Sequence, residues 1–159
     1  THCMVGEHES PSAYEKTNSI VQSSNEGIQM LETMNSTVTW VMNGAGTPVA
    51  AFGNQETNNI GMIIDIKAKD AKTFVNEVNK MMKNTSVDGS MIVFQDTFTG
   101  IKGRTHYVAI SSSSLEGALS NLDNSLSSPE GQAYLKRAQK FRKVMGRALF
   151  SLVKSWEAK

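Results

Sequence analysis

Cysteine is almost absent from this sequence, since Cys3 is the single one among 159 residues. A lone cysteine excludes an internal disulfide and any zinc site that is built on several cysteines. Hydrophobic stretches are short, and none approaches the roughly 18 residues that a membrane-spanning helix needs. The formal net charge is only +1, so the charge of the whole chain favours neither a nucleic acid nor another charged partner.

Motifs that carry known chemistry are missing as well. The segment 43–46 (Asn-Gly-Ala-Gly) lacks the length and the lysine of a phosphate-binding loop, and no GxSxG, HExxH or calcium-loop motif occurs. Potential metal ligands gather only near the start of the chain: His2, Cys3, Glu7, His8 and Glu9. Their spacing matches no metal motif, so a polar chain end is favoured over a metal site. The sequence requires no metal or other cofactor, and whether the protein is an enzyme stays open.

The composition is that of a folded, water-soluble protein. Apolar residues make up 39% and charged residues 19%, and the length suits one domain over 1–159. No signal segment opens the chain, although a leader can be removed. The compartment therefore stays open, with the cytoplasm favoured.

The first part of the chain is expected to be helical. Ser10 and Pro11 form a helix start, and apolar residues at helical spacing continue to about residue 34. Residues 23–27, rich in Ser, Asn and Gly, are a point where this helix bends or breaks. Residues 1–9 could form a short strand ahead of it, although they alternate poorly.

Strands and helices then alternate. Strands are predicted over 37–42, 60–66, 91–96 and 105–110, with a glycine turn at 43–46, an extended segment over 47–52 and a hairpin connection over 97–103. A helix begins after Asp70. Capping-box patterns at 113–116 and 127–130 start two more helices, the first lined by leucines and the second running to the end of the chain.

Two segments, 37–82 and 91–126, share the order strand, loop, strand, helix. Because hairpins make neighbouring strands antiparallel, this order predicts an α+β fold with one antiparallel sheet and helices on a single face. The domain then consists of an N-terminal strand and helix (1–36), two strand-strand-helix units (37–126) and a long basic amphipathic helix (127–159).

This order resembles the ferredoxin-like fold, in particular the dimeric α+β-barrel superfamily. The segment from Thr105-His-Tyr-Val-Ala-Ile to the Ser-Pro-Glu of residues 128–130 is similar in style to those proteins. The resemblance implies a homodimer in which two sheets face each other around a cavity. Some members use that cavity for haem or for cofactor-free oxidation of aromatic substrates.

Candidate ligand-binding residues follow from strand alternation. Tyr107 is expected on the sheet face opposite the helices, where Asp65, Thr39 and Gln95 would join it. His106 is expected on the helix-packed face. A desolvated Asp65 could act as a base, whereas the alternative is a paired or solvent-facing carboxylate. The site is then a pocket for a small apolar or aromatic ligand.

The end of the chain offers a second hypothesis. Residues 130–159 hold eight basic and two acidic residues, a net of +6, whereas residues 1–129 hold eight basic and thirteen acidic residues, a net of −5. Basic residues recur at helical spacing as Lys136, Lys140, Lys143, Arg147 and Lys154. Such a stripe could bind an anionic partner. Nucleic acid is not favoured because no aromatic residues lie between the basic ones. The alternative is an ordinary amphipathic helix that packs on its own domain or across a homodimer.

Overall fold

The protein is described by a computed structural model, which covers residues 2–39, 43–54 and 60–155. Its contacts divide the chain into two compact units, Thr1–Val41 and Met42–Lys159. The single domain expected over 1–159 stays a prediction. Every helix in the described part of the chain is too short or too polar to reach across a lipid bilayer.

The first unit is a pair of helices, α1 (Pro11–Ser23) and α2 (Asn25–Thr37). The break predicted within 23–27 is confirmed, because the Ser24 hydroxyl accepts a hydrogen bond from the Gly27 amide and caps α2. Residues 2–9 form neither helix nor strand. The strand predicted over 37–42 is wrong at its start, since Thr37 ends α2. Residues 40–42 lie outside the described residues.

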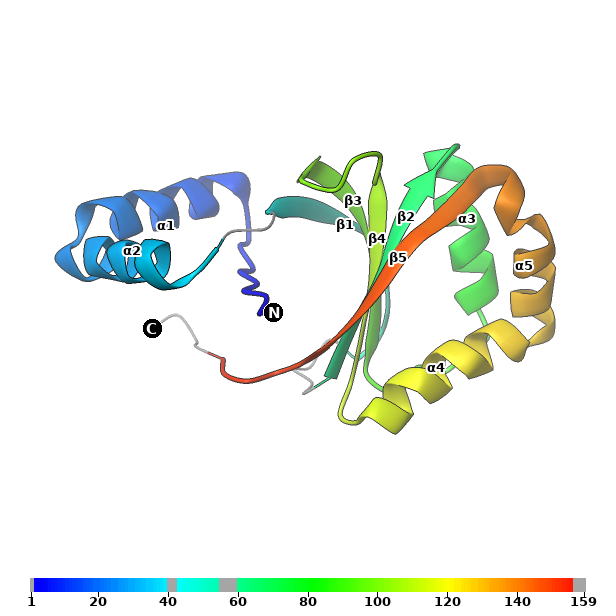
Figure 1. Ribbon diagram of the computed structural model, residues 1–159. Helices are drawn as coiled ribbons and strands as arrows, with labels where there is room; N and C mark the ends of the chain where they lie inside the picture. Colours follow the sequence, from blue (N-terminus) through cyan, green and yellow to red (C-terminus); the bar gives the residue numbers. More distant parts are fainter. Residues whose placement is uncertain (1, 40–42, 55–59, 156–159) are drawn as a thin grey trace. The chain divides into compact units, whose positions relative to one another are not determined.

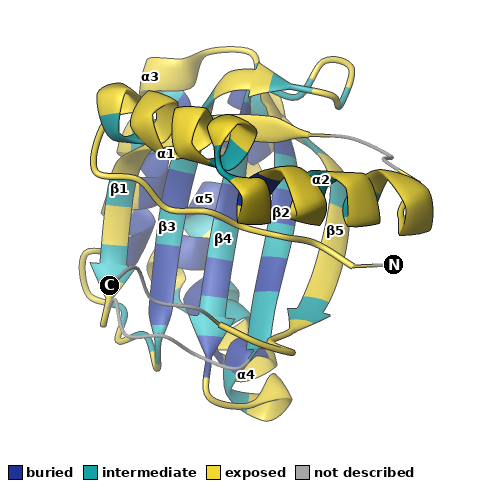
Figure 2. Cartoon of the chain, turned by 90° about the vertical axis from the view of Figure 1, so that its left-hand side faces the viewer, coloured by how far each residue is buried: buried dark blue, intermediate teal, exposed yellow. Residues whose placement is uncertain are grey.

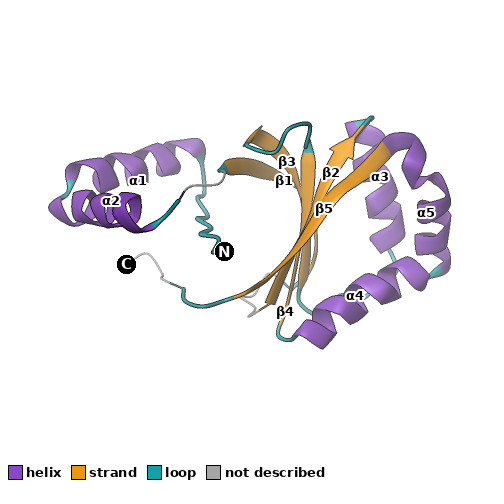
Figure 3. Cartoon of the chain, viewed as in Figure 1, coloured by secondary structure: helices purple, strands orange, loops and turns teal. Residues whose placement is uncertain are grey.

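The second unit contains five strands and three helices among its described residues. In chain order they are β1 (Gly44–Gly53), β2 (Ile60–Ala68), α3 (Ala71–Met82), β3 (Ser90–Thr99), β4 (His106–Ser112), α4 (Leu115–Ser127), α5 (Pro129–Phe141) and β5 (Arg142–Ser151). The strands form one antiparallel sheet in the order β1-β3-β4-β2-β5 (Figure 2). Helices α3, α4 and α5 lie on one face of this sheet (Figures 1 and 3). The predicted α+β class with a ferredoxin-like antiparallel sheet is therefore confirmed.

The face under the helices is the hydrophobic core. On β2, Met62, Ile64 and Ile66 are buried while the residues between them are not, because successive strand side chains point to opposite faces. Helix α3 contributes Phe74 and Val78, each 1% exposed. Burial of such side chains contributes roughly 1.5–3 kcal/mol each, so this layer holds the second unit together.

The end of the chain differs most from its prediction. Helix α5 stops at Phe141, and residues 142–151 form the edge strand β5 beside β2. The long basic helix expected over 127–159 is therefore wrong. The physical reason is that β2 needs an antiparallel neighbour on its free side, and residues 142–151 satisfy nine of its cross-strand positions.

Smaller corrections concern β1 and the helix caps. The predicted turn at 43–46 is wrong, because residues 44–53 are strand β1, which pairs with β3 and not with β2. The first strand pair is thus no hairpin, unlike β3 and β4. Helices α4 and α5 begin one residue later than their capping patterns predict, with Ser114 and Ser128 as the N-caps.

Candidate functional site

The sheet face opposite the helices carries the candidate site. One row of cross-strand neighbours on this face runs from Phe94 on β3 through Tyr107 on β4 and Asp65 on β2 to Gly146 on β5. Residues on the same face of neighbouring strands are close enough to interact. The predicted placement of Asp65 and Tyr107 on one face therefore agrees with the strand register, and their role in binding stays a prediction.

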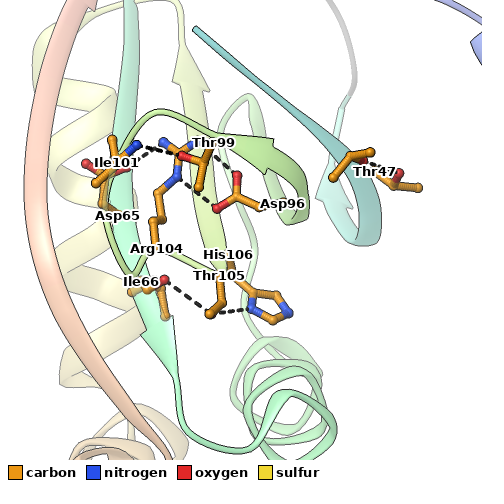
Figure 4. Close-up of polar contacts among 10 residues, drawn as sticks. Thr47, Asp65, Ile66, Asp96, Thr99, Ile101, Arg104, Thr105 and His106 are labelled. Atoms are coloured by element: carbon orange, nitrogen blue, oxygen red, sulfur yellow. Dashed lines mark hydrogen bonds and ion pairs between the residues drawn. The ribbon is translucent and has the colours of Figure 1, made fainter. Parts of the chain in front are cut away.

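An arginine organises this row (Figure 4). Arg104 lies just before β4, and its Nη1 donates to Asp65 Oδ1 at 2.8 Å. Its Nε and Nη2 donate to the two carboxylate oxygens of Asp96 on β3, at 3.0 and 2.9 Å. The paired side chains are mostly buried, with 9% of Arg104, 18% of Asp65 and 6% of Asp96 exposed. Of the two alternatives for Asp65, the structure thus shows the paired carboxylate.

Tyr107 lies between this ion cluster and an aromatic neighbour. Its ring stacks on Phe94 with centroids 4.7 Å apart and planes inclined by 10°, and the Arg104 guanidinium carbon is 4.8 Å from the ring centre. On the side of β1, a Cβ at Gly46 would come within 2.8 Å of the Tyr107 ring. Glycine is therefore needed at position 46 for the tyrosine to lie where it does.

The surroundings shift the ionisation of these groups. Burial raises the pKa of the Tyr107 hydroxyl above its ordinary value, and the positive charge of Arg104 offsets part of that rise. Burial opposes the charged form of Arg104, but hydrogen bonds to Asp96 and Asp65 outweigh it and raise the pKa of Arg104. At neutral pH the face therefore presents a neutral phenol beside a charged, paired arginine.

Two predicted ligand residues lie elsewhere. Gln95 pairs across the sheet with His106, so it shares the face of the helices and not that of Tyr107. The prediction placed Gln95 on the wrong face of the sheet. Phe94 lies on the face of Tyr107, and the next residue along a strand points to the opposite face. Thr39 belongs to the first unit, where it is exposed and lies outside any helix or strand.

His106 lies on the helix-packed face, as the alternation predicts. It is 2% exposed, its Nδ1 is 2.9 Å from the Thr105 hydroxyl, and its ring meets the edge of Phe74 at 5.4 Å. Its buried Nε2 has no hydrogen-bond partner among the described residues. Burial lowers the pKa of His106, and the charge of Asp96 partly opposes this. His106 is therefore a core residue in this fold, on the opposite face from Tyr107.

The predicted basic stripe is divided between a helix and a strand, because α5 ends at Phe141 and β5 begins at Arg142. Lys136 and Lys140 are exposed on α5, whereas Lys143 and Arg147 are on β5. Lys143 pairs with Lys67 and Arg147 with Ile64, so these two point to opposite faces of the sheet. The helical surface proposed for an anionic partner does not form.

Sequence reasoning missed Arg104, Asp96 and Phe94. Asp96 and Phe94 could have been found by extending the alternation along β3, since both share the face of Tyr107. Arg104 has no comparable local signal, because its two partners are 8 and 39 positions away. Within the described residues, no three His, Cys, Asp or Glu side chains gather as metal ligands.

Comparisons with known proteins support the fold alone. No protein-family model and no curated protein matches the sequence. Two similar crystal structures bear the name putative monooxygenase. The one from Lactobacillus acidophilus NCFM has 17% identity and a TM-score of 0.52, over 88% of this chain and 63% of its own. The one from Fusobacterium nucleatum subsp. nucleatum has 9% identity and a TM-score of 0.53, over 86% and 62%. This chain thus spans less than two thirds of either structure's length.

Proposed function

We propose that the protein is a homodimer of the dimeric α+β-barrel type whose facing sheets enclose a small aromatic ligand. The observation that carries this proposal is the apolar and aromatic character of the sheet face that α3, α4 and α5 leave uncovered. Its half-buried residues include Ile63, Ile92, Phe94, Tyr107 and Ala109. A sheet face of this composition, when it is not packed inside its own unit, is typical of an interaction surface. A second copy is the simplest cover, because most oligomers are symmetric.

The sheet edges favour face-to-face association over edge-to-edge association. Edge strand β1 contains Pro48 and two register shifts against β3. Edge strand β5 carries Lys143 and Arg147 and one register shift against β2. Proline, bulges and basic residues are the features by which edge strands avoid pairing with other chains. This leaves the sheet face opposite the helices, called the open face from here on, as the surface through which two sheets associate.

The stacked rings of Phe94 and Tyr107 support an aromatic ligand. Flat aromatic surfaces 4.7 Å apart can extend by one more ring, and offset stacking adds about 0.5–1.5 kcal/mol beyond area burial. The Tyr107 hydroxyl makes no hydrogen bond with the described residues, so it is available to orient a polar group of the ligand. A few polar groups on an apolar surface are typical of small-molecule sites.

A second candidate is cofactor-free oxidation of the bound aromatic compound. It is favoured by the names of the two similar structures and by the resemblance in the sequence. Because Asp65 is held by Arg104, the neighbouring Tyr107 hydroxyl is the group proposed to exchange a proton with the ligand. Oxygen uptake with bound aromatic compounds tests this candidate, and uptake that Tyr107→Phe leaves unchanged would argue against it.

The association is tested with a charge placed on the open face. Ala109 is half-buried at the centre of this face, on the middle strand β4. We expect the wild-type protein to be a dimer in light scattering after size exclusion, and Ala109→Asp to be a folded monomer. The matched control is Leu119→Asp on α4, where Leu119 is 49% exposed. A monomeric wild type, or a dimer lost only in the control, would reject the proposal.

The ligand is sought by thermal-shift screening with haem and small aromatic compounds. A true ligand raises the melting temperature in the wild type and fails to do so in Phe94→Ala and Tyr107→Phe. Leu119→Ala is the control that should keep the shift. A set of hits whose binding ignores both open-face substitutions would overturn the proposed site.

A further inference from the structure

Arg104 bridges strands that do not touch each other. Its guanidinium binds Asp96 on β3 through two nitrogens and Asp65 on β2 through the third. In the sheet order, β4 lies between these two strands. The side chain therefore passes over β4 on the open face, where it also covers the ring of Tyr107. The Arg104 side chain thus contacts one side chain of the candidate site on each of three strands: Asp96 on β3, Asp65 on β2 and Tyr107 on β4.

The main chain fixes the base of Arg104 as firmly as its tip. The Arg104 amide donates to the Ile101 carbonyl at 3.1 Å, and the next residue, Thr105, donates to the Ile66 carbonyl at 3.0 Å. The Thr105 hydroxyl accepts from the Ala68 amide at 2.8 Å. Because both ends are held, the planar fork has one geometry, which a flexible lysine could not reproduce.

The charge of Arg104 is already matched within the protein. One guanidinium faces two carboxylates, so the cluster carries a net charge of −1. An anionic ligand that sought this arginine would have to displace a carboxylate that is itself buried and then left unpaired, which is costly. Two other cations on this face, Lys67 and Lys143, are exposed, where water and salt screen their attraction for an anion.

We propose that Arg104 is a positioning residue that aligns Tyr107 and Asp65, and that the ligand on this face is an uncharged aromatic compound. The ligand class rests on the proposed function, whereas the alignment of Tyr107 by Arg104 does not. The ligand's ring packs on the aromatic pair, and its polar group meets the Tyr107 hydroxyl. Arg104 acts through these neighbours and does not itself bind the ligand.

The alignment is tested without any ligand, by following the ionisation of Tyr107. Tyrosine labelled at Cζ gives separate NMR signals for the three tyrosines, and Tyr107→Phe assigns the one of interest. We expect Arg104→Met to raise the pKa of Tyr107, because the positive charge that lowers it is removed, and Arg104→Lys to restore part of the effect. The signal of Tyr134, whose cationic partner is Arg142, should stay unchanged. An unchanged Tyr107 titration in Arg104→Met would overturn the alignment.

The ligand class is tested with matched probes at pH 7, namely 2-naphthol and the anionic 2-naphthoate. By calorimetry we expect 2-naphthol to bind at least about tenfold more tightly than 2-naphthoate, and Arg104→Met to weaken 2-naphthol about tenfold, which corresponds to about 1.4 kcal/mol. Arg137→Met is the control, because Arg137 pairs with Glu77 on the helix layer; it should change neither result.

Two outcomes would contradict the ligand class. Tighter binding of 2-naphthoate that Arg104→Met abolishes would show that Arg104 binds ligand directly. Failure of both probes would overturn the ligand class together with the proposed function, while the Tyr107 titration still decides the role of Arg104. If Arg104→Met does not fold by circular dichroism, Arg104→Lys replaces it in both experiments, with smaller changes expected in the same directions.

Discussion

The two faces of the central sheet are built from the same strands and differ in almost every other property. The face under α3, α4 and α5 is close-packed, and Val93 and Phe74 are essentially inaccessible to solvent. The open face is half-buried and mixes aromatic rings with an ion cluster. Among the described residues, His106 Nε2 on the covered face is the one buried side-chain nitrogen or oxygen without a hydrogen-bond partner, whereas the open face leaves the rings of Phe94 and Tyr107 partly exposed. Stability is therefore concentrated on the covered face, whereas the proposed contacts with a second copy and with a ligand belong to the open face.

The glycines on the open face sharpen this contrast. Gly46 and Gly146 stand beside Tyr107 and Asp65, where a side chain would come within 2.8 and 3.4 Å of them. On the covered face, one row of cross-strand neighbours on the central strands consists of Val93, Val108 and Ile64. Close packing in a core requires filled volume, whereas these two glycines leave space that the Tyr107 ring and the Asp65 carboxylate occupy. The two sides of the same strands therefore differ in the size of the side chains that they carry.

The largest expected effect is a difference between the two faces in how much a buried ring contributes to the free energy of unfolding. Phe74→Ala should lower the free energy of unfolding by about 3–5 kcal/mol, because it leaves a cavity in a packed core. Phe94→Ala removes the same ring from the half-buried face and should cost clearly less. Urea titration at a protein concentration that keeps the oligomeric state constant measures both. Equal losses would contradict the division of roles between the faces.

A smaller effect tests the space above β1. Gly46→Ala places a methyl group against the Tyr107 ring and should destabilise the protein by about 1–3 kcal/mol, as overpacking does. The companion variant Gly46→Ala with Tyr107→Ala removes the clash and should show a favourable coupling in a double-mutant cycle. Additive effects of the two substitutions would show that the ring does not lie over Gly46.

The buried histidine on the covered face predicts a pH dependence. Because burial lowers the pKa of His106, this histidine binds a proton less readily in the folded protein than in the unfolded chain. Below the ordinary value of 6.5 the unfolded state thus holds more protons, and the free energy of unfolding should fall as the pH drops. Unfolding curves between pH 7.5 and 5 measure this decline. His106→Leu should flatten it; a decline that persists unchanged in His106→Leu would contradict the assignment.

The smallest effect concerns the cap that starts α4. Ser114→Ala should destabilise by about 1 kcal/mol, because the Gly117 amide loses its acceptor at 3.0 Å. Ser113→Ala, one residue earlier, is the matched control and should stay within about 0.5 kcal/mol of the wild type. Thermal unfolding of both variants is sufficient. A larger loss in Ser113→Ala would place the cap where the sequence pattern predicts it.

The parts of the fold predicted from sequence are those with local signals. Residues 60–82 combine an apolar strand, a capping aspartate and a helical apolar stripe, and they form β2 and α3 as expected. The hairpin of β3 and β4 likewise follows from two strands joined by a glycine-containing loop. In these segments, intrinsic preference, periodicity and turn residues all indicate the same structure.

The parts that were wrong depend on partners distant in sequence. Strand β5 has basic and apolar residues that fit a helical period as well as an edge strand, and only its pairing with β2 decides between them. Helix α4 turns Leu115 and Leu119 outward, because Asn121 is held inside by the main chain of Asp88. The ion cluster of Arg104 is equally non-local, so the candidate site was predicted only in its strand residues.

Intermolecular contacts between methyl groups test most directly whether a second copy covers the open face. A sample mixed from methyl-labelled and unlabelled protein reveals such contacts by isotope-filtered NMR. We predict intermolecular signals from Ile63 and Ile92, which lie on the open face, and none from Ile64 in the core. Intermolecular signals from Leu119 on α4 instead, or none at all, would contradict the account.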